Sequence, residues 1–231
     1  MKKLLSLILA LGLALSLIGC GSKGPEILGT YDTTINLKDM LVEEINAGMD
    51  MATETSLTDY MSDFNMVVVS EFSEDGTYKQ YVDMDQFTAS YEQFKTEVTA
   101  YMKDMLAEVL IVSLADSGVV VETVEELESA LGMTYEEIIQ MSLGMDLESF
   151  VNLAMDESVN LEEMSEEATS EGKYKAEDGK LYMSDSLDTE IDESAYELYT
   201  IEGDVVTITE GVNIEADEYI DYPFELNKRA K

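Results

Sequence analysis

The chain contains no histidine and no tryptophan, and it has a single cysteine among its 231 residues. Without histidine there is no imidazole to serve as a general base, to complete a serine or cysteine triad, or to bind zinc in the usual way. One cysteine cannot form a disulfide within the chain. Any bound metal would need oxygen ligands, which suits calcium or magnesium.

Basic residues are also scarce, with 13 Lys and Arg against 50 Asp and Glu and a net charge of −37. Nucleic acids are bound largely through basic side chains that neutralise phosphates, so this balance argues against a nucleic-acid partner. It also opposes peripheral binding to an anionic bilayer. An acidic surface attracts cations or a basic partner, or it simply keeps the protein soluble by self-repulsion.

The first twenty residues differ from the rest of the chain. Lys2 and Lys3 precede an apolar run over residues 4–18, which is the organisation of an export signal. The run is shorter than the roughly 20 apolar residues that span a bilayer comfortably. We therefore expect a signal peptide here, with a retained membrane span as the alternative.

The end of this run, Leu-Ile-Gly-Cys at residues 17–20, resembles a bacterial lipobox. In lipoproteins with this motif a diacylglycerol is attached to the cysteine sulfur, and the chain is cleaved just before it. The resemblance implies a signal peptide over residues 1–19 and lipidation of Cys20. More than one acyl chain gives stable anchoring, so the expected location is the extracytoplasmic face of a cell membrane. An ordinary signal peptide is the alternative.

Composition and periodicity divide the remaining chain into four parts. Residues 20–26 contain the lipidated cysteine and a short flexible tether. Residues 27–83 and 172–231 are rich in β-forming patterns and are expected to form one β-domain. Residues 84–171 are helical and are expected to be inserted between the two β-rich parts. At 45% hydrophobic residues, the chain can bury a substantial core.

Tight turns between β-prone runs predict three hairpins. The turns lie at residues 75–76, 178–179 and 203–204, and each contains Asp and Gly. Together with strands near Tyr31 and Phe224, they predict about eight strands, mostly joined by tight turns. This pattern is typical of an antiparallel up-and-down barrel or a strongly coiled sheet, so the predicted fold class is α+β.

Closure of such a barrel makes a further prediction. The strands near Tyr31 and Phe224 should be neighbours, which would bring Lys23 close to a group of basic residues near the C-terminus. That group comprises Lys228, Arg229 and Lys231. We expect this basic pole to face anionic lipid headgroups.

Apolar residues at spacings of three and four over residues 87–109 predict a long amphipathic helix. The helix becomes more uniformly apolar between Leu106 and Leu114, which predicts that its far end is buried. Shorter helices should follow, because capping boxes begin at Thr123 and Thr134. A further short helix is expected earlier in the chain, between a cap at Asn36 and a stop at Gly48.

Four short motifs of the β-rich parts resemble small lipocalin-like domains found in surface lipoproteins of Gram-positive bacteria. The motifs are Gly-Thr-Tyr at 29–31, Glu-Phe-Ser-Glu-Asp-Gly-Thr-Tyr at 71–78, Gly-Lys-Tyr at 172–174 and Tyr-Thr-Ile-Glu-Gly-Asp at 199–204. The resemblance implies a lipocalin-like barrel and a binding function without an assigned ligand. It carries over no catalytic residue, and the helical insertion between strands three and four departs from the family pattern. A Gram-negative envelope remains the alternative location.

Acidic clusters raise the question of calcium binding. Asp188, Glu190 and Asp192 alternate like the start of a calcium loop, but Glu193 stands where the loop needs glycine and Tyr199 where it needs glutamate. A shorter cluster, Asp83 with Asp85, is similarly incomplete. We therefore predict at most weak calcium binding and no dedicated metal site.

Two residue types suggest possible binding surfaces. Tyrosines on the predicted strands could line a barrel interior that accepts a small apolar ligand, or they could form its core; they are Tyr31, Tyr78, Tyr81, Tyr174, Tyr182 and Tyr199. Methionines fit core packing, copper binding or a groove for a basic amphipathic partner; the close pairs are Met49 with Met51 and Met102 with Met105.

The sequence as a whole predicts a lipid-anchored, non-enzymatic binding or interaction module with no catalytic residue and no cofactor. Two alternatives remain open. One is an acidic, Met-rich accessory protein that docks a basic partner. The other is an envelope hydrolase that uses a pair of carboxylates, whose separation sequence alone does not define.

Overall fold

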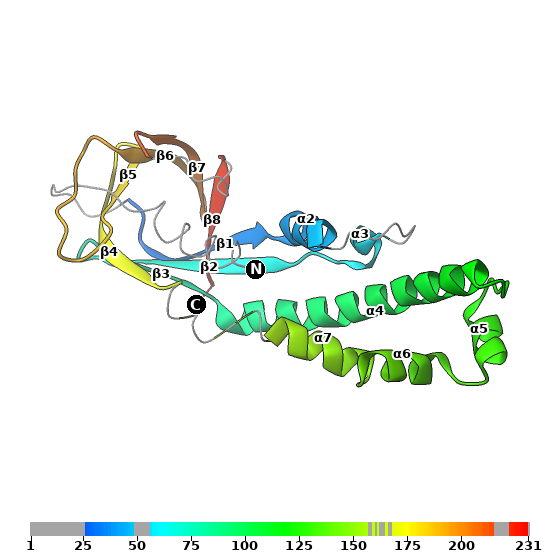
Figure 1. The fold of residues 1–231 in the computed structure, drawn as a ribbon. Coiled ribbons are helices and arrows are strands. Elements are labelled where there is room, and N and C mark those ends of the chain that lie inside the picture. The colour runs from blue at the N-terminus through cyan, green and yellow to red at the C-terminus, as the bar shows by residue number, and fades with distance from the viewer. Residues whose placement is uncertain are drawn as a thin grey trace. The chain divides into compact units, whose positions relative to one another are not determined.

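The computed structural model describes residues 26–48, 56–156, 168–214 and 222–230, together with Val159, Leu161 and Ser165. The chain divides into two compact units. The barrel unit comprises residues 1–35, 66–87 and 161–231, and the helical unit comprises residues 36–65 and 88–160. Figure 1 shows the strands and helices that make up each unit.

The barrel unit is a closed eight-stranded antiparallel barrel in which the strands follow one another in chain order. The strands are β1 (Gly29–Asn36), β2 (Asn65–Phe72), β3 (Thr77–Val82), β4 (Ser170–Glu177), β5 (Lys180–Met183), β6 (Tyr196–Glu202), β7 (Val205–Val212) and β8 (Phe224–Lys228). Strand β1 closes the barrel against β8, with Tyr31 opposite Lys228 and Asp32 opposite Asn227. The predicted α+β barrel, and the predicted neighbouring of the first and last strands, are therefore confirmed.

The three predicted hairpins are present between β2 and β3, β4 and β5, and β6 and β7. In the β4–β5 turn, Asp178 and Gly179 both have positive φ, at 51° and 74°. Two consecutive residues with positive φ are what a type I′ turn requires, and the twist of that turn matches the twist of the paired strands. Local turn chemistry thus determines three of the strand pairings.

Close packing inside the barrel requires a glycine on β4. A Cβ atom on Gly172 would lie 2.1 Å from the carbonyl oxygen of Ser184, which is nearer than any real Cβ contact. The same carbonyl accepts a hydrogen bond of 2.7 Å from the Tyr78 hydroxyl. The missing side chain therefore lets the chain just after β5 approach β4 closely.

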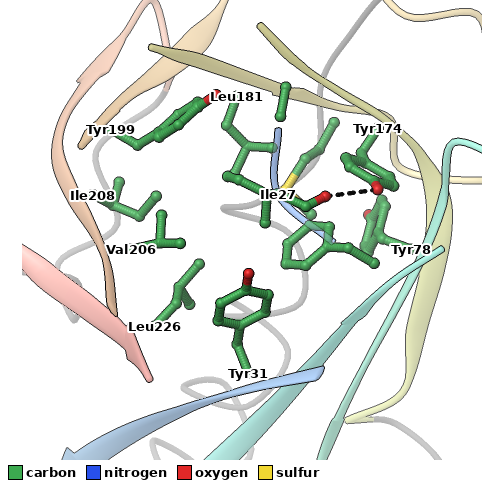
Figure 2. Close-up of a cluster of buried hydrophobic side chains, with 12 residues drawn as sticks. Ile27, Tyr31, Tyr78, Tyr174, Leu181, Tyr199, Val206, Ile208 and Leu226 are labelled. Carbon is green, nitrogen blue, oxygen red and sulfur yellow. Dashed lines mark hydrogen bonds between the residues drawn. The ribbon is translucent and has the colours of Figure 1, made fainter. Parts of the chain in front are cut away.

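The barrel interior is occupied by the protein's own side chains (Figure 2). The cluster contains Ile27, Tyr31, Phe72, Tyr78, Tyr174, Ala176, Leu181, Met183, Tyr199, Val206, Ile208 and Leu226. Ile27 precedes β1 and is fully buried in this cluster. The Tyr174 hydroxyl lies 2.9 Å from the carbonyl oxygen of Ile27, so a hydrogen bond holds the incoming chain inside the barrel.

The helices comprise two groups in chain order. Between β1 and β2 lie α2 (Lys38–Gly48) and α3 (Leu57–Tyr60). Between β3 and β4 lie α4 (Met84–Asp116), α5 (Val124–Leu131), α6 (Tyr135–Leu143) and α7 (Leu147–Asp156). The second group confirms the predicted helical insertion between the third and fourth strands.

Helix α4 is the long element of the helical unit, at 33 residues. Lys103 Nζ lies 2.8 Å from a carboxylate oxygen of Glu136 on α6, and Lys95 Nζ lies 3.2 Å from Asp156 at the end of α7. Because these partners appear in reverse order along the chain, α5 to α7 run back along α4. The predicted capping box at Thr134 is complete, whereas at Thr123 the Glu126 carboxylate accepts from the backbone N–H of Glu122 instead.

Residues 36–65 belong with the helices rather than with the barrel. The prediction that residues 27–83 form part of the β-domain as one block therefore differs from the observed division. The physical reason is aromatic packing on α4, since the rings of Phe64 and Phe94 lie 5.2 Å apart and those of Tyr60 and Tyr101 lie 5.8 Å apart. The structure thus has two insertions, one on each side of the β2–β3 hairpin.

Candidate functional site

Several predicted functional residues lie outside the described part of the chain. These are the signal peptide over residues 1–19, the lipobox Cys20, and Lys23, Met49, Met51 and Lys231. The lipidation of Cys20 therefore stays a prediction. Within the residues described, no helix has the length and apolar character needed to cross a bilayer.

Four of the six candidate tyrosines belong to the barrel core. Tyr31, Tyr78, Tyr174 and Tyr199 are each at most 5% exposed and pack within the interior cluster (Figure 2). An apolar ligand inside the barrel would have to displace these rings and the aliphatic side chains around them. The interior therefore has the character of a packed core.

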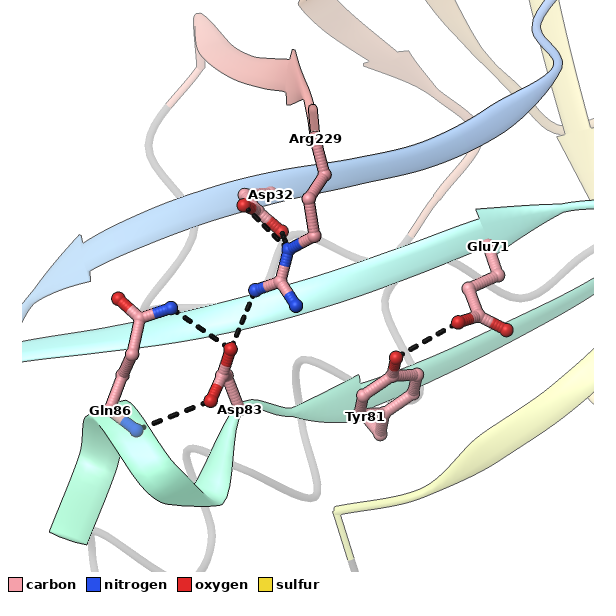
Figure 3. Close-up of polar contacts among 6 residues, drawn as sticks. All are labelled: Asp32, Glu71, Tyr81, Asp83, Gln86 and Arg229. Atoms are coloured by element: carbon pink, nitrogen blue, oxygen red, sulfur yellow. Dashed lines mark hydrogen bonds and ion pairs between the residues drawn. The ribbon is translucent and has the colours of Figure 1, made fainter. Parts of the chain in front are cut away.

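The other two tyrosines make their contacts away from this cluster. Tyr81 is half-buried and donates a hydrogen bond of 2.9 Å to Glu71 (Figure 3). Tyr182 alternates with Leu181 and Met183 along β5, so it lies on the opposite face of the strand from these core residues. Its ring packs 5.6 Å from that of Tyr196.

A buried carboxyl group lies on β6. Glu197 is two residues before Tyr199, so both side chains lie on the inner face of the strand, and Glu197 is 2% exposed. One carboxyl oxygen accepts a hydrogen bond of 3.0 Å from the Tyr222 hydroxyl. The other oxygen has no hydrogen-bond partner.

The environment of Glu197 favours its neutral form. Burial raises the pKa of Glu197 to about 8, and the hydrogen bond from Tyr222 opposes this only in part. Tyr222 in turn packs on Gly211 of β7, where a Cβ atom would lie 2.7 Å from its hydroxyl oxygen. Gly211 is the residue opposite Glu197 in the β6–β7 ladder. The glycine therefore makes room for the ring that contacts the carboxyl.

A glycosidase-type mechanism needs two carboxyl groups at a defined separation. Among the residues that the structure describes, Glu197 is the one fully buried acidic side chain. The hydrolase alternative stays a prediction, because the mechanism requires a separation between two carboxyl groups and not the burial of both.

The basic pole predicted from barrel closure is altered by ion pairing. Arg229 donates through Nε to Asp32, at 2.7 Å and 2.9 Å from its two carboxylate oxygens, and through Nη2 to Asp83, at 2.6 Å (Figure 3). Asp83 also accepts from the backbone N–H and the side-chain amide of Gln86 in the first turn of α4. The Arg229 charge is therefore compensated within the barrel unit by two carboxylates. That the basic residues near the C-terminus face lipid headgroups stays a prediction.

The candidate calcium residues are not gathered into a cation site. Nowhere in the described ranges do three acidic residues converge in a way that could hold a metal ion. Asp192 accepts a hydrogen bond of 3.1 Å from the Ser194 backbone N–H, and Asp83 is engaged by Arg229. Of these carboxylates, Asp192 thus stabilises a turn and Asp83 forms an ion pair.

A polar hollow of about 210 Å³ lies between α4 and α7. It is lined by Glu92, Lys95, Thr96, Thr99, Glu148 and Asn152. Lys95 is 7% exposed and lies between Glu92 and Asp156, at 2.8 Å and 3.2 Å. Burial lowers the pKa of Lys95, but the two carboxylates outweigh it and the net pKa is raised. The positive charge of the Lys95 ammonium group is thus balanced by the carboxylates of Glu92 and Asp156.

The C-terminal end of α4 is exposed, which contradicts the predicted burial of residues 106–114. Of these residues only Ala107 is buried, while Val112 is 60% exposed. The connection to α5 continues the pattern, because Val119 and Val120 are 43% and 80% exposed. Apolar character predicted burial, but α5 to α7 cover α4 mainly at earlier turns.

We name this surface the apolar end of α4. It consists of the partly or fully exposed side chains of Leu106, Val109, Leu110, Ile111, Val112, Leu114, Val119 and Val120. Met105, one residue earlier, is 3% exposed and belongs to the core of the helical unit. Core packing, rather than metal binding, therefore accounts for Met105.

Sequence reasoning missed Glu197 and misjudged the apolar end of α4. A signal for Glu197 existed, since it shares the alternating face of Tyr199 in a strand whose inner positions are apolar. For the end of α4 there was no local signal, because burial depends on which elements pack nearby.

No protein-family model, curated protein or solved structure matches this chain.

Proposed function

We propose that this protein is a lipoprotein anchored through Cys20 on the extracytoplasmic face of a cell membrane, where it acts as a non-enzymatic interaction module. Its binding surface is the outside of the molecule, and in particular the helical unit. The barrel serves as the stable support, and the lipid supplies the membrane attachment that the acidic surface cannot provide.

The observation that carries the binding part of this proposal is the contrast between the two units. The barrel interior is filled by twelve side chains of its own core. In the helical unit, Val112 and Val120 are 60% and 80% exposed, whereas the most exposed large apolar side chain described in the barrel unit, Ile201, is 44% exposed. Contiguous exposed apolar surface is typical of sites that bind other molecules.

The lipobox motif at residues 17–20 supports the anchoring part, and it can be tested in cells. After growth with an alkyne-tagged fatty acid, the wild-type protein should be labelled and should partition into detergent. Cys20→Ala should abolish both properties, because Cys20 is the only cysteine in the chain.

A relocated cysteine provides the matched control. The double variant Cys20→Ala with Ser6→Cys keeps one cysteine but places it early in the apolar run, and we expect no label on it. Label retained on Cys20→Ala, or absent from the wild-type protein, would contradict anchoring through Cys20.

A further inference from the structure

The apolar end of α4 departs from the acidic character of the chain around it. Between Glu108 and Asp116 the sequence has no charged residue, and Val109 to Val112 are four consecutive aliphatic residues. All four are partly or fully exposed in the structure. Val112 is 60% exposed and the other aliphatic side chains of this segment are only partly buried, so covering them with a partner would remove further apolar area from water.

The charges that follow the start of the apolar end along the chain are acidic. No Lys or Arg occurs in the sequence between Lys103 and Lys173. Acidic residues, in contrast, lie on both sides of the apolar side chains along the chain; they are Asp104, Glu108, Asp116, Glu122, Glu125 and Glu126. Along the chain, the apolar side chains are therefore flanked mainly by carboxylates, and the nearest cation, Lys103, already pairs with Glu136.

We propose that the apolar end of α4 is a docking site for a basic amphipathic helix of a partner protein. This inference rests on the proposed function, and it specifies the surface and the chemistry of the partner. The apolar face of the partner helix covers the aliphatic side chains, and its flanking Lys and Arg pair with the acidic border.

The dimensions suit a short helix. From Leu106 to Asp116, α4 rises roughly 15 Å, which corresponds to about three turns of a helix lying alongside it. The apolar side chains recur along this length, and Val119 and Val120 extend the surface beyond the helix end. A partner helix of about three to four turns can therefore lie along the side of α4 on which Val112 is exposed.

The charge pattern disfavours the two other possible occupants. A second copy of this chain would bring an identical acidic border against this one, so like charges would face each other. A membrane surface with anionic lipids would repel the same border, and no cation between Lys103 and Lys173 is present to offset the repulsion. A basic partner helix satisfies both the apolar centre and the anionic border.

The test uses the full chain in nanodiscs of neutral phosphatidylcholine, with empty nanodiscs as the reference. The probe is a synthetic peptide of Leu and Lys, about four turns long, arranged to be amphipathic as a helix. Fluorescence anisotropy of the labelled peptide should show saturable binding to the wild-type protein that weakens as salt is added.

Paired variants localise the binding. We expect Val112→Asn with Val120→Asn to weaken binding at least about tenfold, because the most exposed side chains of the surface are lost. Met141→Asn with Leu153→Asn is the matched control, since these side chains are 73% and 50% exposed on α6 and α7. The control should change binding by less than about twofold. All four positions are exposed, so folding should be retained, which far-UV circular dichroism checks.

Several outcomes would overturn the proposal. If the Val112/Val120 variant bound the Leu/Lys peptide as tightly as the wild-type protein does, the apolar end of α4 would not be the binding site. If a Leu/Glu peptide bound as tightly as the Leu/Lys peptide, the partner would not need to be basic. Self-association that the Val112/Val120 variant abolishes would make a second copy the occupant. If the protein bound anionic vesicles in preference to the peptide, the occupant of this surface would be a membrane. Lipid labelling at Cys20 is read separately, so loss of peptide binding leaves the anchoring proposal intact.

Discussion

At the scale of single residues, the side chain with the most unusual environment is Glu197. Its carboxyl group is buried: one oxygen accepts a hydrogen bond from half-buried Tyr222, and the other has no hydrogen-bond partner. Burial raises the pKa of Glu197 to about 8, far above the value near 4.3 of an unfolded glutamate. The folded protein therefore binds a proton between these two pH values that the unfolded chain has released.

This proton uptake predicts a specific pH dependence. Because the folded state binds more protons, the contribution of Glu197 to the free energy of unfolding is largest at about pH 4 and decreases as pH rises toward 8. Glu197→Gln keeps the shape of the side chain and is neutral at every pH. Between pH 5 and pH 8, the free energy of unfolding of the wild-type protein should therefore fall by about 3 kcal/mol more than that of the variant. Urea denaturation at the two pH values measures the difference.

Glu225 on β8 provides the control for this experiment, because it is exposed. Glu225→Gln should show the same pH dependence as the wild type. If Glu197→Gln also follows the wild type, the buried carboxyl is ionised in the folded state and the assignment of its protonation is wrong.

At the scale of secondary-structure elements, one arginine joins three segments of the barrel unit. Arg229 follows β8, Asp32 lies on β1, and Asp83 lies between β3 and α4 (Figure 3). Burial raises the pKa of Asp83, but the hydrogen bonds from Gln86 and Arg229 outweigh it, so the net pKa lies below its usual value. The ion pairs therefore stabilise the barrel at the point where its first and last strands meet.

A double-mutant cycle with Arg229→Met and Asp83→Asn should measure this coupling. We expect about 1–2 kcal/mol near pH 7, because the pair is charge-assisted and mostly shielded from solvent. For a carboxyl group whose pKa is lowered by folding, the stabilisation is present above its unfolded pKa of about 3.9 and is lost as pH falls through the folded pKa. The coupling should therefore disappear in acid.

The exposed pair Lys103 and Glu136 is the comparison, at 48% and 69% exposure of the side chains. Its coupling, measured by Lys103→Met and Glu136→Gln, should be smaller, because solvent screens exposed ion pairs. A coupling at Arg229 no larger than this one would show that the barrel closes without help from the ion pairs.

At the scale of the whole molecule, the two units differ in how much apolar surface they leave exposed. The barrel buries a cluster of twelve side chains around Ile27, and the most exposed apolar side chains described, Val120 and Met141, belong to the helical unit. The net charge of −37 surrounds both with an anionic field. Such a field disfavours self-association and attracts cationic partners.

The filled barrel predicts the result of native mass spectrometry on the full chain purified from its producing cell. Apart from the lipid proposed on Cys20, we expect the mass of the polypeptide alone and no further small molecule, because the core cluster occupies the barrel interior. A stoichiometric apolar molecule that co-purifies and survives removal of detergent would contradict the filled interior. It would also revive the ligand-binding hypothesis for the strand tyrosines.

Much of the fold could be predicted from sequence because it depends on local chemistry. The Asp-Gly turn at residues 178–179 and the capping box at Thr134 involve groups a few residues apart, so their residue types are informative by themselves. Closure of β1 against β8 was also predictable, since about eight strands joined by tight turns leave the first and last as neighbours.

The sequence alone determined the acidic charge, the absence of histidine chemistry, the positions of the turns and the alternation that makes a barrel. Tertiary structure decided what those patterns enclose. Whether tyrosines line a cavity or a core, whether Glu197 meets water, and whether the end of α4 is covered all depend on contacts between residues far apart in the chain. Periodicity shows which face of an element is apolar, but only packing shows what covers it.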